Sequence, residues 1–259
     1  MNRQRRDAIR IAEIVRRQVR KMNDRRAQSM NDRIESVLTI ARRLESAYSR
    51  VRKAHARGWR TAMTQMQGRA CRLGDELQRE AIGLPHLYEW ATPTPVPTPR
   101  DVLNELHQLA DEFGDWQSTP GSDELSVRTD AIELDDVYLG PFEIRLRLND
   151  LHLSAGGQPY TVEALDPQPA TSNDHVTHPH VSDRALCAGD AIGAIRSAIE
   201  SGRLCDFFLI VSRVLHTYNP ESPYVELEHW HGIACSECGD TTNEDDSIRC
   251  ERCECTVCS

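Results

Sequence analysis

The sequence predicts an α+β protein of three parts: long N-terminal helices in a hairpin or coiled coil, a central antiparallel sheet with helices, and a small C-terminal zinc finger. Three observations support this prediction. Apolar residues recur at spacings of three and four before Pro85, which is the first proline. Apolar and charged residues alternate from Phe142 to Leu148, as in a half-buried strand. Six of the nine cysteines fall between Cys235 and Cys258.

Charge separates the helical part from the rest of the chain. Residues 1–80 contain 21 Lys or Arg and 9 Asp or Glu, a net charge of +12, whereas the whole chain carries −9. Residues 81–259 therefore carry −21, and such asymmetry indicates separate modules. We interpret residues 1–90 as a basic helical arm whose apolar positions are Ile9, Ile11, Ile14, Val15, Val19, Ile34, Val37, Leu38, Ile40, Ala41, Leu44 and Tyr48.

This arm has three candidate roles. We expect it to form a helical hairpin or a coiled coil that supports self-association. The apolar faces of such helices pack on each other, and their interleaved charges can remain in water without another partner. The first alternative is a basic surface for an acidic partner such as nucleic acid. The second is docking on the acidic remainder of the chain.

A proline-rich linker, residues 91–100, follows the arm. Its alternating prolines enforce an extended, semi-rigid spacer. Asp101 is the expected N-cap of the next helix, which begins a central domain over residues 101–230. The apolar face of this helix comprises Val102, Leu103, Leu106, Leu109, Ala110 and Phe113.

The central domain contains strand patterns followed by helical ones. We expect one strand within residues 136–148, with Phe142, Ile144, Leu146 and Leu148 on one face, and a second within residues 159–167. Residues 191–215 predict two helices, interrupted near Ser201-Gly202. Their expected apolar positions are Ile192, Ile195, Ile199, Phe208, Val211, Val214 and Leu215.

Between the strands and the helices lies a motif of unusual residues. His178-Pro179-His180 precedes Leu186-Cys187, and Asn219-Pro220-Glu221-Ser222-Pro223 follows the second helix. This order resembles the ubiquitin-conjugating enzyme family over roughly residues 101–230. In that family a His-Pro-Asn triplet precedes the thioester cysteine, and an Asn-Pro-x-x-Pro element follows a helix. Here His180 replaces the Asn of the triplet, and the gap to Cys187 is about one residue shorter.

The resemblance implies an acyltransferase. Cys187 would accept a ubiquitin-like protein from its activating enzyme as a thioester, and then release it to an amine of a protein target. His180 would hold the loop or stabilise the oxyanion, and Asp190 would cap the following helix. Asn219 would shape the far end of the site. Cys205, in contrast, is expected to be a core residue, and His178 a structural one.

The cysteine-rich tail, residues 231–259, predicts a Zn²⁺ site, because paired C-x-x-C knuckles can complete a tetrahedral set of thiolates. Three ligand partitions are open. A zinc ribbon uses Cys235, Cys238, Cys250 and Cys253. A treble-clef or RING-like finger joins the first knuckle to Cys255 and Cys258, leaving Cys250 and Cys253 for a second site. A binuclear cross-brace would need a further cysteine beyond Ser259.

The N-terminus is Arg-rich without an apolar signal core, and no apolar run approaches the ~18 residues of a membrane span. We therefore expect a cytoplasmic protein with reduced cysteines and no membrane partner. Two other functions remain open. One is a noncatalytic scaffold with a conjugating-type fold that binds a ubiquitin-like protein or other partners. The other is a nucleic-acid-binding zinc protein, although the finger itself is acidic around Glu237, Asp240 and Glu244.

Overall fold

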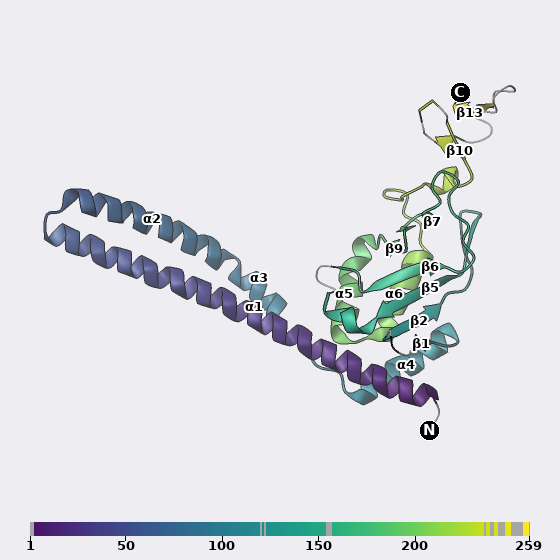
Figure 1. Cartoon of the computed structure of the whole chain (residues 1–259), viewed down its shortest axis with the longest axis horizontal. Coiled ribbons are helices and arrows are strands. Elements are labelled where there is room, and N and C mark those ends of the chain that lie inside the picture. The colour runs from purple at the N-terminus through teal and green to yellow at the C-terminus, as the bar shows by residue number, and fades with distance from the viewer. Residues whose placement is uncertain are drawn as a thin grey trace. The chain divides into compact units, whose positions relative to one another are not determined.

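The structure is a computed structural model that describes residues 3–119, 121, 123–153, 157–235, 237–238, 241–242, 247–249 and 256–258. It contains helices and antiparallel sheets, as the α+β prediction requires. The chain forms two compact units. We call Arg20–Pro95 the hairpin unit, and Met1–Val19 together with Val96–Ser259 the sheet unit (Figure 1).

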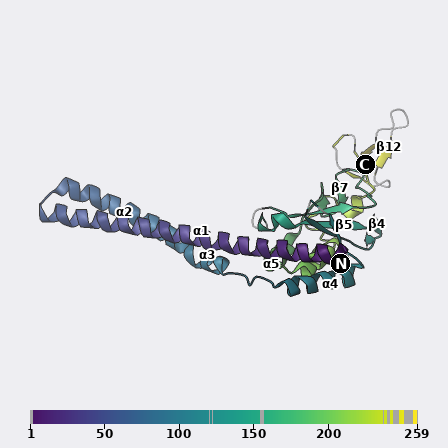
Figure 2. The same cartoon turned by 60° about the horizontal axis from the view of Figure 1, so that its bottom comes forward.

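The hairpin unit contains most of α1 (Arg3–Ala56), together with α2 (Arg60–Ile82) and α3 (Leu84–Ala91). α1 and α2 run side by side in Figures 1 and 2 and are joined by a turn at Gly58, whose φ is +71°. Ile40, Ala47, Ala70 and Leu73 are buried in the seam between the two helices. The predicted helical hairpin is therefore present.

The first residues of α1 do not belong to that hairpin. The sequence placed residues 1–90 in one arm, but residues up to Val19 form part of the sheet unit. Ile11, Val15 and Val19 are fully buried there, and the side chains of Val15 and Pro97 both lie close to Gly202. The Arg16 Nε also donates to the Pro97 carbonyl at 3.0 Å. Helical periodicity identified this apolar face but not the surface that it contacts.

The main sheet of the sheet unit has four antiparallel strands in the order β1-β2-β5-β6. The strands are β1 (Gln117–Thr119), β2 (Glu124–Arg128), β5 (Phe142–Arg147) and β6 (Tyr160–Ala164). Phe142, Ile144 and Leu146 are fully buried on one face, which confirms the predicted alternation. On the other face Glu143 is also buried, because the Ser126 hydroxyl and the Arg145 guanidinium donate to its carboxylate.

A small hairpin, β3 (Ile132–Leu134) and β4 (Val137–Gly140), is inserted between β2 and β5. The strand expected from residue 136 onward is therefore two strands that belong to different sheets. The break occurs at Gly140, whose φ is +77° and where a Cβ atom would lie 2.8 Å from the Asp166 carbonyl oxygen. Only glycine fits this position without strain.

Three helices complete the core of this unit: α4 (Pro99–Phe113), α5 (Ile192–Ser201) and α6 (Leu204–Leu215). α4 packs on α6, and α6 contacts β5. The N-cap of α4 is Thr98 rather than Asp101, because Thr98 and Asp101 exchange hydrogen bonds in a capping box. α5 and α6 are separate, as predicted, but Ile192 is half exposed because it lies in the first turn of α5, away from the core.

The shorter elements are the 3₁₀ turns η1 (Leu148–Leu153), η2 (Gly189–Ala191) and η3 (Leu227–His229), and the strands β7 to β13 described with the sites below. None of the described helices is both long and apolar enough to cross a lipid bilayer.

Gly140→Ala should destabilise the sheet unit more than Gly114→Ala does. Both glycines have a φ of +77°, but only Gly140 faces a backbone oxygen, whereas a Cβ at Gly114 meets nothing within 4 Å. We expect a loss of about 1 kcal/mol for Gly114→Ala and roughly 3 kcal/mol for Gly140→Ala. Urea unfolding of the two variants measures this difference. Equal losses would show that the approach to Asp166 is not restrictive.

Candidate functional site

A three-stranded sheet of very short strands carries the motif residues. It comprises β7 (Val176–His178), β8 (Val181–Ser182) and β9 (Ala185–Leu186). Asp183 and Arg184 join β8 to β9 with φ angles of +49° and +67°, typical of a tight two-residue hairpin turn. This tight turn lets the chain reverse direction within the few residues between His180 and Cys187. The Cys187 amide consequently donates to the His180 carbonyl at 2.8 Å.

His178 is fully buried and both of its ring nitrogens are used. Nε2 lies 2.8 Å from the Leu215 carbonyl at the end of α6, and Nδ1 accepts the His180 amide at 3.0 Å. Because a carbonyl only accepts, the proton of this imidazole must be on Nε2. Burial lowers the pKa of His178 to about 4, so the ring is neutral at pH 7. This arrangement agrees with the structural role expected for His178.

His180 makes the next connection. Its Nε2 accepts the backbone N–H of Asn219 at 3.1 Å, so a neutral His180 carries its proton on Nδ1. Burial lowers the pKa of His180, which favours this neutral form. The Asn219 Oδ1 in turn accepts the Glu221 amide at 3.0 Å. Within the described residues, Nδ1 of His180 has no hydrogen-bond partner and remains available as a donor.

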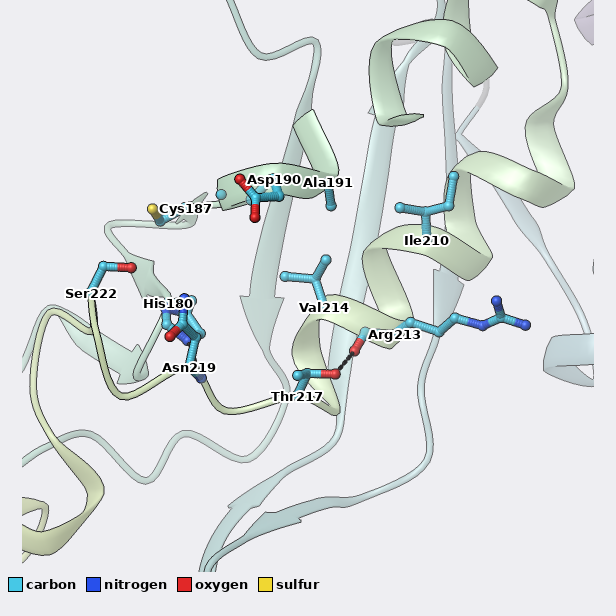
Figure 3. Close-up of a pocket in the computed structure, with 12 residues that line it drawn as sticks. His180, Cys187, Asp190, Ala191, Ile210, Arg213, Val214, Thr217, Asn219 and Ser222 are labelled. Atoms are coloured by element: carbon cyan, nitrogen blue, oxygen red, sulfur yellow. Dashed lines mark hydrogen bonds between the residues drawn. The ribbon is translucent and has the colours of Figure 1, made fainter. Parts of the chain in front are cut away.

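All four residues that the sequence nominated for catalysis line one cavity of about 400 Å³: His180, Cys187, Asp190 and Asn219. Figure 3 shows the Cys187 thiol at one side of this cavity, with His180 and Asn219 beside it. Cys187 is exposed, whereas Cys205 is buried and burial raises the pKa of its thiol to about 11. The core assignment of Cys205 is thereby confirmed.

The expected capping role of Asp190 is wrong. α5 begins at Ile192, its N-cap residue is Ala191, and no side chain caps it. Asp190 lies instead within the 3₁₀ turn η2 and lines the cavity (Figure 3). The extra turn between Cys187 and the helix moves this carboxylate out of capping position.

Sequence reasoning missed several residues that support the site. The Gln158 side chain donates to the Leu186 carbonyl at 2.6 Å, directly before Cys187. Burial raises the pKa of Tyr160 to about 12, and the proximity of Cys187 adds to this effect. The Tyr224 amide donates to the Pro179 carbonyl at 2.8 Å. These contacts join segments far apart in the chain, so no local pattern signals them.

The segment before the cysteine-rich tail is anchored to the sheet unit. Trp230 is fully buried, and its Nε1 donates to the Gln168 carbonyl at 3.1 Å. The Trp230 carbonyl accepts the Thr171 amide at 2.9 Å. His229 pairs with Glu226 at 3.3 Å. The tail therefore starts from a fixed point on the core.

The tail contains two hairpins, β10 (Ile233–Ala234) with β11 (Thr241–Thr242), and β12 (Ser247–Arg249) with β13 (Thr256–Cys258). Cys235 and Cys238 lie between β10 and β11, and the Glu237 amide donates to the Cys235 sulfur at 3.4 Å. Such a donor suits a metal-bound thiolate. Three predicted ligands, Cys250, Cys253 and Cys255, and the side chain of Cys258 lie outside the described residues. Among the residues that the structure describes, no three candidate ligands converge.

No protein-family model, curated protein or solved structure matches this chain.

The stability of the sheet unit should depend on the protonation of His178. Folding lowers the pKa of this residue from 6.5 to about 4, so the unfolded chain binds the proton more readily. The stabilisation is complete above pH 6.5 and is lost as the pH falls toward 4, by roughly 3 kcal/mol. Urea unfolding between pH 7.5 and 4.5 should show a clearly smaller loss in His178→Gln than in the wild type. The share due to His180, whose pKa burial also lowers, should remain.

His107→Gln provides the matched control, because His107 is an exposed residue of α4 in the same unit. It should keep the wild-type pH dependence. If His178→Gln also keeps it, the buried imidazole is not the group responsible.

Proposed function

We propose that this protein conjugates a ubiquitin-like protein, holding it as a thioester on Cys187 before transfer to an amine of a protein target. The observation that carries the proposal is an exposed cysteine whose amide is fixed to the His180 carbonyl, at the edge of a cavity that His180 and Asn219 also line. An activating enzyme would supply the modifier as its own thioester.

The proposed chemistry consists of two acyl transfers. In the first, the Cys187 thiolate attacks the incoming thioester carbonyl, a new C–S bond forms, and the thiolate of the activating enzyme leaves. In the second, a neutral amine attacks the same carbonyl, the bond to Cys187 breaks, and the nitrogen loses a proton to solvent. Each transfer passes through an oxyanion, which a preorganised donor stabilises.

His180 is the residue suited to donate to that oxyanion. Its Nε2 is occupied by the Asn219 amide. His180 lines the cavity, so we assign the donor role to its Nδ1 proton. The same imidazole therefore holds the Asn219 loop and presents a hydrogen-bond donor. Asp190 adds a carboxylate to the cavity wall, where it would attract a cationic amine before deprotonation.

Loading is tested with the full-length protein, ATP, an activating enzyme and its ubiquitin-like protein, taken from the genomic neighbours of this chain. A thiol-sensitive adduct on a nonreducing gel is expected for the wild type and for Cys71→Ala, which removes another exposed cysteine. Cys187→Ala should form none. An adduct that survives Cys187→Ala contradicts the proposal. Stable binding of the modifier without any adduct would instead indicate the noncatalytic scaffold.

Two substitutions separate the roles of His180. An Asn at position 180 places its side-chain nitrogen near the position of Nδ1 of the imidazole. A Gln there places its side-chain amide near the position of Nε2. If the Nδ1 proton stabilises the oxyanion, His180→Gln should slow discharge of the thioester to an amine by about 100-fold, and His180→Asn should recover much of the rate. Discharge from the preloaded protein is followed by gel. Equal rates for wild type and His180→Gln would remove the oxyanion role.

We also propose that the tail binds one Zn²⁺ ion in a ribbon formed by Cys235, Cys238, Cys250 and Cys253. The order of the strands supports this partition. In the sequence, Cys235 and Cys238 lie between β10 and β11, and Cys250 and Cys253 lie between β12 and β13. Four thiolates in two knuckles suit zinc, which would tie the two hairpins together. Thiolate ligands of this kind would require a reducing compartment such as the cytoplasm.

Metal analysis of the purified protein should give one zinc per chain. Cys235→Ser and Cys250→Ser should each lose most of it, because a structural site needs all four ligands. Cys255→Ser should retain it. Zinc loss in Cys255→Ser with retention in Cys250→Ser would favour the treble-clef or RING-like partition, and two zinc ions per chain would contradict a single ribbon.

A further inference from the structure

The end of the hairpin unit at which the turn joins α1 to α2 is strongly basic. The stretch from Ser46 to Gly74 contains no Asp or Glu, and its basic residues are Arg50, Arg52, Lys53, Arg57, Arg60, Arg69 and Arg72. All seven are exposed. The ion pairs between α1 and α2, Arg33 with Glu80 and Arg43 with Glu76, lie outside this stretch. Among the described residues, none of the seven cations is in an ion pair.

Four of these cations share one side of the hairpin. Arg43, Arg69 and Arg72 line the same groove between α1 and α2, together with Asp75 and Glu76 toward its Arg43 end. Residues seven apart lie on the same side of a helix, so Arg50 follows Arg43 along that side, with Lys53 one turn further on. Arg57 comes directly after α1, in the turn that carries Trp59. We define the basic face as Arg50, Lys53, Arg57, Arg69 and Arg72.

The other two cations point away from this face. Arg52 is two residues from Arg50 and therefore lies on the opposite side of α1. Arg60 is nine residues, or two and a half turns, from Arg69 and lies on the opposite side of α2. The chain thus offers a control pair with the same charge at the same end of the hairpin.

An exposed aromatic ring lies at the end of the basic face. Trp59 is 53% exposed, and the Arg57 guanidinium lies 4.9 Å from its ring centroid. The exposed neighbours on α2, Thr64, Gln65 and Gln67, are polar, and Met63 and Met66 between them are only partly exposed. This composition favours a polar partner over insertion into a membrane. Cations beside a single open indole are the combination found where unpaired bases stack and phosphates are neutralised.

We propose that the basic face and Trp59 bind single-stranded nucleic acid. Arg guanidinium groups match phosphate oxygens in a bidentate geometry, and an indole stacks on any unpaired base. A duplex would leave Trp59 without an accessible base. This binding is separate from the conjugation proposed for Cys187 and does not depend on it.

The test measures binding of the full-length protein to a fluorescently labelled oligothymidylate by anisotropy, over a range of salt concentrations. Each phosphate contact contributes about 0.7 to the slope of log affinity against log salt. Arg50→Gln/Arg69→Gln should therefore weaken binding and reduce the slope by about 1.4. Arg52→Gln/Arg60→Gln removes equal charge and should keep the wild-type slope. Arg50→Lys/Arg69→Lys should restore it.

Trp59→Ala should weaken binding to the single strand, and Trp59→Phe should weaken it less. Circular dichroism melting of each variant checks that the hairpin is intact. The proposal is overturned if both Gln pairs weaken binding equally, which would indicate net charge alone. It is also overturned if a duplex of the same length, or polyglutamate, competes as well as the single strand.

Discussion

The candidate site depends on one buried imidazole held between two backbone groups. His178 donates to the Leu215 carbonyl at the end of α6 and accepts the His180 amide from its own loop. Burial keeps the ring neutral, which leaves one nitrogen as donor and the other as acceptor. This interaction joins the strand-side loop to the helical layer, and so places the His180 carbonyl that receives the Cys187 amide.

Hydrogen bonds from His180 then reach residues on both sides of the cavity. His180 fixes Cys187 through its carbonyl and the Asn219 loop through Nε2. An Asn side chain at this position would be shorter, and would not reach the Asn219 amide as the far nitrogen of the imidazole does. The tight turn at Asp183-Arg184 closes the short gap before the cysteine. The resulting site is preorganised by backbone contacts, with the thiol left exposed.

Local sequence patterns correctly predicted the elements that neighbouring residues determine. The alternation around Ile144 identified β5, and the Gly202 break separated α5 from α6. The predictions were wrong where contacts between distant residues determine the structure. The end of β4 at Gly140 depends on Asp166, and the buried face of Val15 depends on the loop at Gly202. All four candidate catalytic residues line one cavity, yet their supporting contacts had no signal in the sequence. The zinc partition stays a prediction, because Cys250, Cys253 and Cys255 lie outside the described residues.

The most direct test of the site is the protonation of its two buried histidines, measured by nitrogen-15 NMR of the imidazole side chains in the full-length protein at pH 7. The hydrogen bonds predict a neutral His178 protonated on Nε2 and a neutral His180 protonated on Nδ1. That result would support the chain of contacts from Leu215 to Cys187 and Asn219. A His180 protonated on Nε2 could not accept the Asn219 amide, and would contradict both the loop contact and the donor proposed for the oxyanion.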